Sequence, residues 1–178
     1  MSPTATAAAV VERLRVMQTG IEVTRTRGSA ADNEVERIIA RAAHAGFSTI
    51  AVGMTQVREA IRQTHTTLAA VHTAISDASA AVTRAPVHES PAQAMTELGQ
   101  AGQHLKTAHD GIIASIGQID ETRTLAMRVL HGGDPGPLLS ILEMIKQNLV
   151  QVLHTGTAAQ QSMTALIHSA QKMGRSDN

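Results

Sequence analysis

Apolar side chains recur every three or four residues over almost the whole length of this sequence. In the last part of the chain they fall at positions 138, 142, 145, 149, 152, 163 and 166. This spacing places them on one face of an α-helix, which has 3.6 residues per turn. The sequence is also rich in alanine, leucine, methionine and glutamine, which favour helices. We therefore predict an all-α protein, an antiparallel bundle of four long helical layers.

Two short segments are predicted to separate the first helix from the second and the second from the third. At residues 27–29, Gly28 and Ser29 predict the end of a first helix and a capping serine for a second one that starts near Ala30. At residues 85–91, Ser90 followed by Pro91 is typical of a helix start, because proline suits the first helical position. Both segments are therefore predicted helix boundaries.

A third segment, residues 131–137, contains three glycines and two prolines. We expect its first glycines to end one helix and Asp134 with Pro135 to begin the next. The last five residues, 174–178, are expected to be a disordered tail. With 178 residues in total, the chain suits one core, and we predict a single helical-bundle domain over residues 1–173.

The segment of residues 30–84 allows two interpretations. The apolar pattern passes through Gly46 without interruption, which favours one long helix. A break near Gly46 would instead give helices of matched length that can pack side by side. We favour the broken form, in which the chain before Gly46 makes one layer bent at Gly28, and the single long helix remains the alternative.

The composition argues against several kinds of partner. Fifteen basic and fifteen acidic side chains give a net charge of zero, so no overall field attracts nucleic acid or anionic lipid. Phe47 is the only aromatic residue and cysteine is absent, so base-stacking platforms, disulfides and thiolate chemistry are excluded. No signal peptide or membrane span is predicted. We expect a cytoplasmic protein, although non-classical export stays open.

The nine histidines do not follow a metal-binding pattern. No two of them are spaced i,i+4, and His65 and His72 would lie about 10 Å apart on one helix. The sequence also lacks a phosphate-binding loop and a nucleophile motif. We predict no catalytic residue, no cofactor and no metal site, and hence a protein that is not an enzyme.

Glycine and methionine suggest a tentative groove for a ligand or partner. Four glycines interrupt the third helix, and each costs about 1 kcal/mol relative to alanine. We expect another helix to approach closely where these glycines lack a side chain, and the alternative is that the glycines open a groove for a ligand or partner. Methionines can fill a core or line an adaptable cavity. The tentative groove residues are Gly99, Gly102, Gly111, Gly117, Met54, Met144 and Met163.

Several segments carry a resemblance to a known group of proteins. They are GF at 46–47, IAVGM at 50–54, VREAIRQ at 57–63 and GGDPGPLL at 132–139. With the arginine-rich, lysine-poor composition, the chain resembles a family of uncharacterised actinobacterial all-helical proteins. The resemblance implies a setting near natural-product gene clusters, including enediyne clusters. It implies no activity and no functional residues.

These observations lead to one functional prediction and one alternative. Long apolar helix faces without convergent polar side chains predict a non-enzymatic interaction protein that acts through self-association, as a dimer, or through a protein partner. The alternative is a protein that binds and sequesters an apolar small molecule between its helices, such as a natural product in self-resistance. No nucleic-acid or membrane partner is expected.

Overall fold

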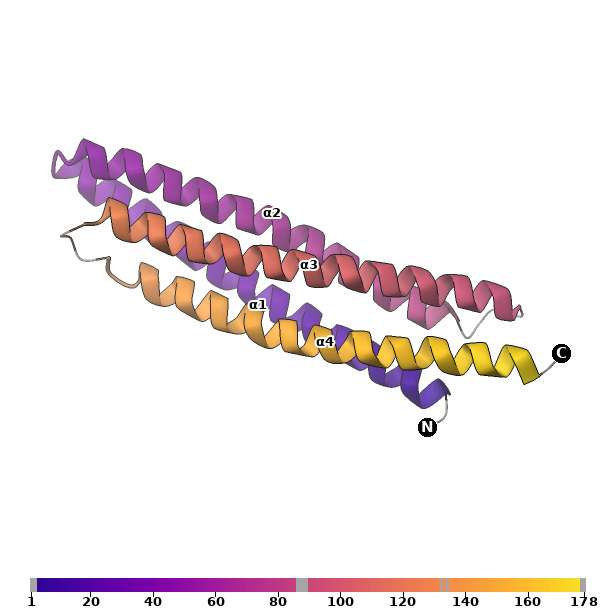
Figure 1. Ribbon diagram of the computed structural model, residues 1–178. Coiled ribbons are helices and arrows are strands. Elements are labelled where there is room, and N and C mark those ends of the chain that lie inside the picture. Colours follow the sequence, from indigo (N-terminus) through magenta and orange to yellow (C-terminus); the bar gives the residue numbers. More distant parts are fainter. Residues whose placement is uncertain (1–2, 86–89, 132, 134, 177–178) are drawn as a thin grey trace.

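A computed structural model describes residues 3–85, 90–131, 133 and 135–176, which form four long helices (Figure 1). They are α1 (Pro3–His44), α2 (Ser48–Arg84), α3 (Pro91–Val129) and α4 (Leu138–Ser176). The described part of the chain contains no strand. The predicted all-α fold is confirmed.

The helices alternate in direction and form an elongated bundle (Figure 1). Helix α1 packs against α2 and α4, and α3 packs against the same two helices. One end of the bundle carries the α1–α2 and α3–α4 connections, and the other carries both termini and the α2–α3 connection. The contact between α3 and α4 is the least extensive of the four helix–helix contacts.

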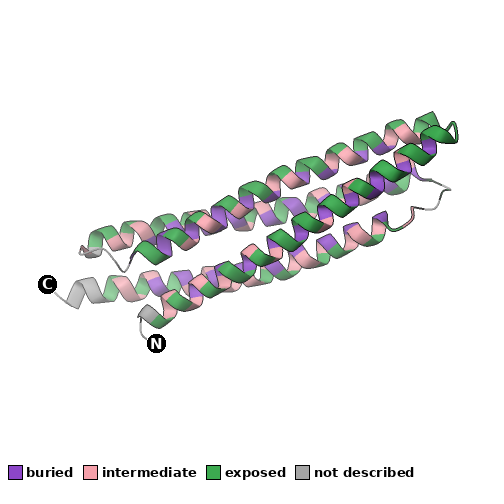
Figure 2. Ribbon diagram, turned by 180° about the vertical axis from the view of Figure 1, so that it is seen from behind, coloured by how far each residue is buried: buried purple, intermediate pink, exposed green. Residues whose placement is uncertain are grey.

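The buried side chains lie on the inward faces of all four helices (Figure 2). They form one continuous apolar cluster, whose largest fully buried members are Leu14, Met17, Ile21, Met54, Ile61, Leu68, Ile75, Leu105, Ile112, Ile119, Leu138 and Leu142. Burial of aliphatic side chains at about 25 cal/mol per Å² drives their association. The helical spacing of the sequence thus produces the core.

The chain breaks at Gly46, which decides between the two interpretations of residues 30–84. Gly46 has a φ of +80°, a left-handed conformation that glycine adopts without a Cβ clash. The Gly46 amide donates to the Ala43 carbonyl at 3.1 Å, and the Phe47 amide donates to the Ala42 carbonyl at 2.8 Å. This pair of bonds is a Schellman motif, which ends α1 before α2 begins at Ser48.

The predicted boundary at residues 27–29 is wrong. Helix α1 runs through this segment for 42 residues without interruption. The Ser29 hydroxyl donates to the Arg25 carbonyl inside the helix and does not cap a new one. Gly28 is buried at the α1–α2 contact, where a Cβ would lie 2.4 Å from Nε2 of His65. Packing of a neighbouring side chain, and not a turn, therefore explains this glycine.

The remaining boundaries agree with the predictions or differ from them by a few residues. Helix α3 begins at Pro91 after an extended Ser90, as predicted, although the Ser90 side chain makes no capping hydrogen bond. Helix α4 begins at Leu138, later than predicted, and Asp134 lies outside the described residues. The helix continues to Ser176, so residues 174–176 are helical where a disordered tail was expected, and residues 177–178 lie outside the described part.

Candidate interaction surface on helices α3 and α4

The four glycines of the tentative groove occupy different surroundings. A Cβ at Gly111 would lie 2.5 Å from Cγ2 of Val71, so α2 approaches α3 closely at this position. At Gly99 and Gly117 a Cβ would meet nothing within 4 Å. At Gly102 it would make ordinary contact, 3.9 Å from Cγ of Met163. Close helix packing therefore accounts for Gly111 alone among these four residues.

The three methionines of the tentative groove are also separated. Met54 and Met163 are buried in the core, whereas Met144 is exposed. Met54 lies about 45 Å along α2 from the α2–α3 connection, and Gly99 lies close to that connection. The structure brings Gly102 and Met163 together but does not bring the seven predicted residues around one groove.

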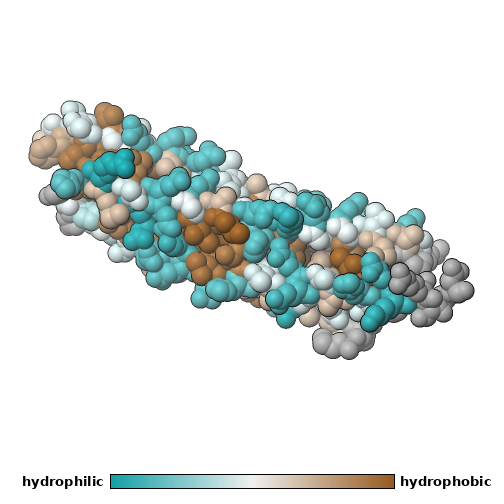
Figure 3. Space-filling model, in the orientation of Figure 1, coloured by the Kyte–Doolittle hydropathy of each residue, from teal (hydrophilic) through white to brown (hydrophobic). Residues whose placement is uncertain are grey.

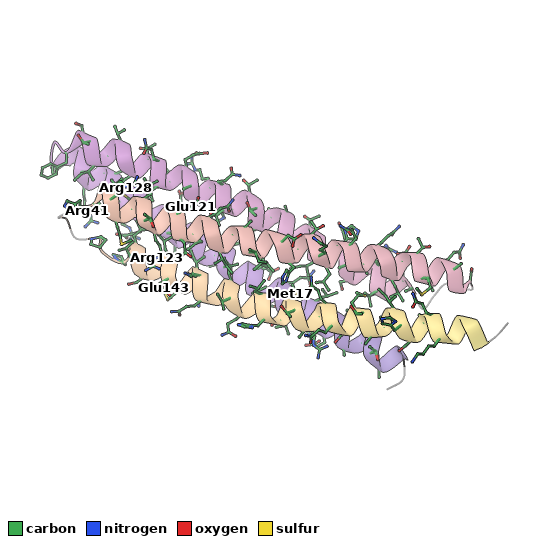
Figure 4. All side chains as sticks on the ribbon, viewed as in Figure 1. Met17, Arg41, Glu121, Arg123, Arg128 and Glu143 are labelled. Carbon is green, nitrogen blue, oxygen red and sulfur yellow. The ribbon has the colours of Figure 1, made fainter. Side chains whose placement is uncertain are left out.

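A different surface is defined by two ion pairs between α3 and α4. Nζ of Lys146 lies 2.8 Å from Oδ1 of Asp120, and Nη1 of Arg123 lies 2.8 Å from Oε2 of Glu143. Arg123 and Glu143 are labelled where they meet in Figure 4. All four side chains are partly exposed, at the outer edge of the α3–α4 contact. The pairs therefore fix which residues of α3 and α4 lie at the same height, meaning the same position along the bundle axis.

Apolar side chains continue this row in both directions. Because the helices are antiparallel, a step of three or four residues along α3 matches an equal step backward along α4. In one direction Ile116 comes to the height of Val150, and Ile113 to that of Leu153. In the other direction Met127 comes to the height of Leu139. We call these ten residues the α3–α4 face; they are Ile113, Ile116, Asp120, Arg123, Met127, Leu139, Glu143, Lys146, Val150 and Leu153.

The apolar members of the α3–α4 face remain accessible to solvent. Ile113 is 50% exposed and Met127 is 49% exposed, while Ile116, Val150 and Leu153 are half-buried. In the space-filling view an apolar area lies over the middle of α3 and α4, bordered by hydrophilic side chains (Figure 3). This face was not predicted from the sequence, because its residues continue the helical pattern of the core. The sequence feature that indicates this face is Ile113, which directly follows the core residue Ile112, because two adjacent residues of a helix point in different directions.

The charges of the α3–α4 face balance, since each cation is paired with an anion. Nε of Arg123 is buried and has no hydrogen-bond partner among the described residues.

Two ion pairs outside the face shift the pKa of one partner each. Further along α3, the Lys106 ammonium donates to Asp110 at 2.6 Å and thereby lowers the pKa of the Asp110 carboxyl. On the opposite side of the bundle, a hydrogen bond to Asp32 raises the pKa of the Arg58 guanidinium.

A second feature is a hollow of about 420 Å³ at the end of the bundle that carries the α1–α2 and α3–α4 connections. Its lining is mainly apolar and includes Ile38, Ala42, Phe47, Ile50, Leu130 and Pro137. The lining also contains the buried carboxylate of Glu34, which pairs with Arg37 at 2.7 Å and with Arg41, a second charged lining residue, at 3.5 Å. Arg41 is labelled at this end of the molecule in Figure 4.

Two histidines of α2 contact α1. His65 covers Gly28, and His72 lies 3.7 Å from the Glu22 carboxylate. Among the described residues, no group of three or more histidines and acids is arranged to hold a metal ion. Nor does any helix in the described part have the length and hydropathy needed to cross a membrane.

Part of the chain is similar to a known family. Residues 89–175 match DUF6244, a family of unknown function. The DUF6244 match contains nearly all of α3 and α4, and with them every residue of the α3–α4 face. The expected similarity to an uncharacterised family is confirmed at this level. No curated protein and no solved structure matches the chain.

Proposed function

We propose that this chain is a non-enzymatic interaction protein that associates with a second copy of itself through the α3–α4 face. The observation that carries the proposal is the row of accessible apolar side chains, centred on Ile113 and Ile116, beside balanced ion pairs. Protein–protein interfaces commonly combine accessible apolar side chains with paired polar ones.

The two helices that carry the face are long enough for such an interface. Over their whole length of 39 residues, packed about 10 Å apart, they offer a surface on the order of 1,000 Å², of which the ten residues of the α3–α4 face occupy about 20 Å along each helix. A stable interface buries about 800 Å² per partner. A second copy suits the face because it carries equal numbers of positive and negative side chains, so that a copy offers matching charges. The DUF6244 match also falls on these two helices.

The test compares two exposed apolar residues on different faces. Multi-angle light scattering should show a dimer for the wild-type chain and a monomer for Ile113→Glu, because an unpaired charge is costly to bury among the apolar side chains of an interface. Val52, which is 64% exposed on α2, provides the matched control, and Val52→Glu should leave the dimer intact.

Two results would overturn the proposal. The first is a wild-type chain that stays monomeric at about 100 µM, far above the Kd of a typical specific dimer; this result would redirect the search to a different protein partner. The second is an Ile113→Glu variant that dimerises like the wild type. Circular dichroism should show the same helix content for all three proteins, because both substituted positions are exposed.

A second candidate function is binding of an apolar small molecule, and the hollow at the end of the bundle favours it. Its volume of about 420 Å³ and apolar lining suit a compact apolar ligand. This site lies at the end of the bundle, whereas the sequence suggested a site between the helices. An actinobacterial origin near natural-product genes, proposed on the family resemblance, would supply such a ligand.

Native mass spectrometry of the purified chain tests the second candidate. We expect an added small-molecule mass on the wild-type chain and its loss in Ile50→Glu, which places a charge in the hollow. Detection of the bare chain alone, after purification from a producing cell extract, would argue against ligand sequestration.

A further inference from the structure

We infer that the hollow at the end of the bundle binds an amphipathic organic anion, whose acidic group is held by Arg37 and Arg41 and whose apolar part fills the apolar side of the hollow. The inference rests on the second candidate function, small-molecule binding in this hollow, and names the chemical class of the ligand. None of the residues of the α3–α4 face is among the described residues that line the hollow, so ligand binding there is compatible with self-association.

A second hollow adjoins the first at Glu34 and Arg41. It has a volume of about 530 Å³ and is lined by Glu34, Arg37, Ala40, Arg41 and Pro137. Three of these residues, Glu34, Arg41 and Pro137, also line the first hollow. Arg41 therefore lies between the two, at the end of the molecule where Figure 4 labels it. A molecule with an apolar part and a charged group suits an apolar hollow that borders on arginines.

The charges that a ligand meets at this place are positive. The side chains of Arg37 and Arg41 are 71% and 70% exposed, whereas that of Glu34 is only 5% exposed. Among the described residues of the two linings, two cations thus share one anion, and the anion is the buried member. The accessible excess of positive charge attracts an anionic group and disfavours a cationic one.

The two arginines also retain hydrogen-bond donors for a ligand. A guanidinium carries several N–H groups in a planar fork, which matches a carboxylate, sulfonate or phosphate. Arg37 donates to Oε2 of Glu34 at 2.7 Å, and Arg41 donates to Oε1 at 3.5 Å. Each bond uses a single nitrogen of its guanidinium. Glu34 therefore holds both side chains beside the hollows and leaves other N–H groups for an acidic ligand group.

The first hollow provides the apolar contact. Ile38 and Leu130 belong to the buried core at its base, and Phe47 is 59% exposed at its edge. Apolar side chains are gathered at this end of the molecule in the space-filling view (Figure 3). The volume of about 420 Å³ lies in the range of small-molecule sites. A compact apolar body therefore fits here while its acidic group reaches Arg41.

Two fluorescent dyes with the same aromatic rings test the inference. Anilinonaphthalene sulfonate carries a negative group, and N-phenylnaphthylamine is neutral. The sequence contains no tryptophan and no tyrosine, so dye titrations are free of fluorescence from these residues. Each variant is compared with the wild type for one dye at a time, so that the different hydration of the two dyes cancels.

Opposite effects are expected from removing the cation and the anion. Arg41→Gln should weaken binding of the sulfonate dye about threefold or more, because one cation then remains beside Glu34. Glu34→Gln should strengthen it by about the same factor, because both arginines lose their internal partner. Neither variant should change binding of the neutral dye. The matched control is Arg62→Gln, an exposed arginine of α2 outside both linings, which should affect neither dye.

Two further variants locate the dyes on the molecule. Ile50→Glu places a carboxylate in the first hollow and should weaken both dyes. Ile113→Glu changes the α3–α4 face and should weaken neither. Circular dichroism should show wild-type helix content for the variants. Should Glu34→Gln lose helix content, Arg37→Gln takes its place and should weaken the sulfonate dye as Arg41→Gln does.

Unchanged affinity of Arg41→Gln for the sulfonate dye would overturn the inference. If Ile50→Glu still weakened the neutral dye, apolar small-molecule binding in the hollow would stand while the preference for an anion failed. Wild-type affinity of Ile50→Glu for both dyes, or no binding of either dye to the wild type, would overturn the second candidate function together with the inference.

Discussion

At the scale of single residues, the neighbour across a helix contact decides what a glycine does. Gly111 and Gly117 lie six residues apart on α3. The first lies under Val71 and the second faces open space. Each of these two glycines costs about 1 kcal/mol in helix propensity relative to alanine. Only at Gly111 does close packing of α2 offset this cost.

This difference predicts opposite effects of the same substitution. Gly117→Ala should raise the free energy of unfolding by about 0.5–1 kcal/mol, because alanine restricts the unfolded chain and meets no neighbour. Gly111→Ala should lower it, because a Cβ at 2.5 Å from Cγ2 of Val71 overpacks the contact at a cost of about 1–3 kcal/mol. Urea denaturation measures both. Equal stabilisation by the two substitutions would contradict the close α2–α3 contact.

At the scale of the helices, two glycines of α1 show how similar signals have different outcomes. Gly46 adopts a left-handed conformation and its turn is closed by two backbone hydrogen bonds. Gly28 stays in the helix, where its missing side chain makes room for His65. Both positions combine a glycine with a following serine within two residues. The local sequence is therefore compatible with a turn at both, and only packing separates them.

The continuity of α1 leads to a prediction at Ser29. If Ser29 capped a helix, Ser29→Ala would cost about 1 kcal/mol. Because its hydroxyl instead bonds to the Arg25 carbonyl inside α1 and its side chain is exposed, we expect Ser29→Ala to be neutral or to stabilise by a few tenths of a kcal/mol. Thermal and urea unfolding measure the change. A loss of about 1 kcal/mol would indicate a helix start at Ala30.

At the scale of the whole molecule, neighbouring residues on α3 belong either to the core or to the α3–α4 face. Ile112 is fully buried and Ile113 is half exposed, while Ile116 lies between the two environments. Helix α2 packs along α3, and α4 makes a less extensive contact with it. The same helical pattern thus supplies both the core and the proposed interface.

This partition predicts two kinds of defect from the same substitution. Ile112→Asp and Leu149→Asp should unfold the chain or lower its stability by more than about 3 kcal/mol, because each buries an unpaired charge. Ile116→Asp can direct its carboxylate to solvent, so it should retain the helical fold and weaken the dimer. Circular dichroism and light scattering on each variant separate the two effects. Equal loss of helix content in all three variants would contradict the exposure of the face.

Much of this protein was determined by its sequence alone. The spacing of apolar residues gives four helices with one buried face each, since a 3.6-residue period depends only on the chain itself. The start of α3 at Pro91 follows from proline's fixed φ and missing amide hydrogen. The turn at Gly46 was one of two open interpretations, and matched helix lengths favoured it.

Only the tertiary structure decided which small residues pack closely and which apolar residues stay accessible. Gly28, Gly111 and Gly117 look alike in the sequence, but they differ in what the neighbouring helix places over them. Ile112 and Ile113 are equally hydrophobic, and the direction in which each points relative to α4 separates core from surface. Both distinctions depend on contacts between residues far apart in the chain, and a helical period does not specify how helices rotate against one another.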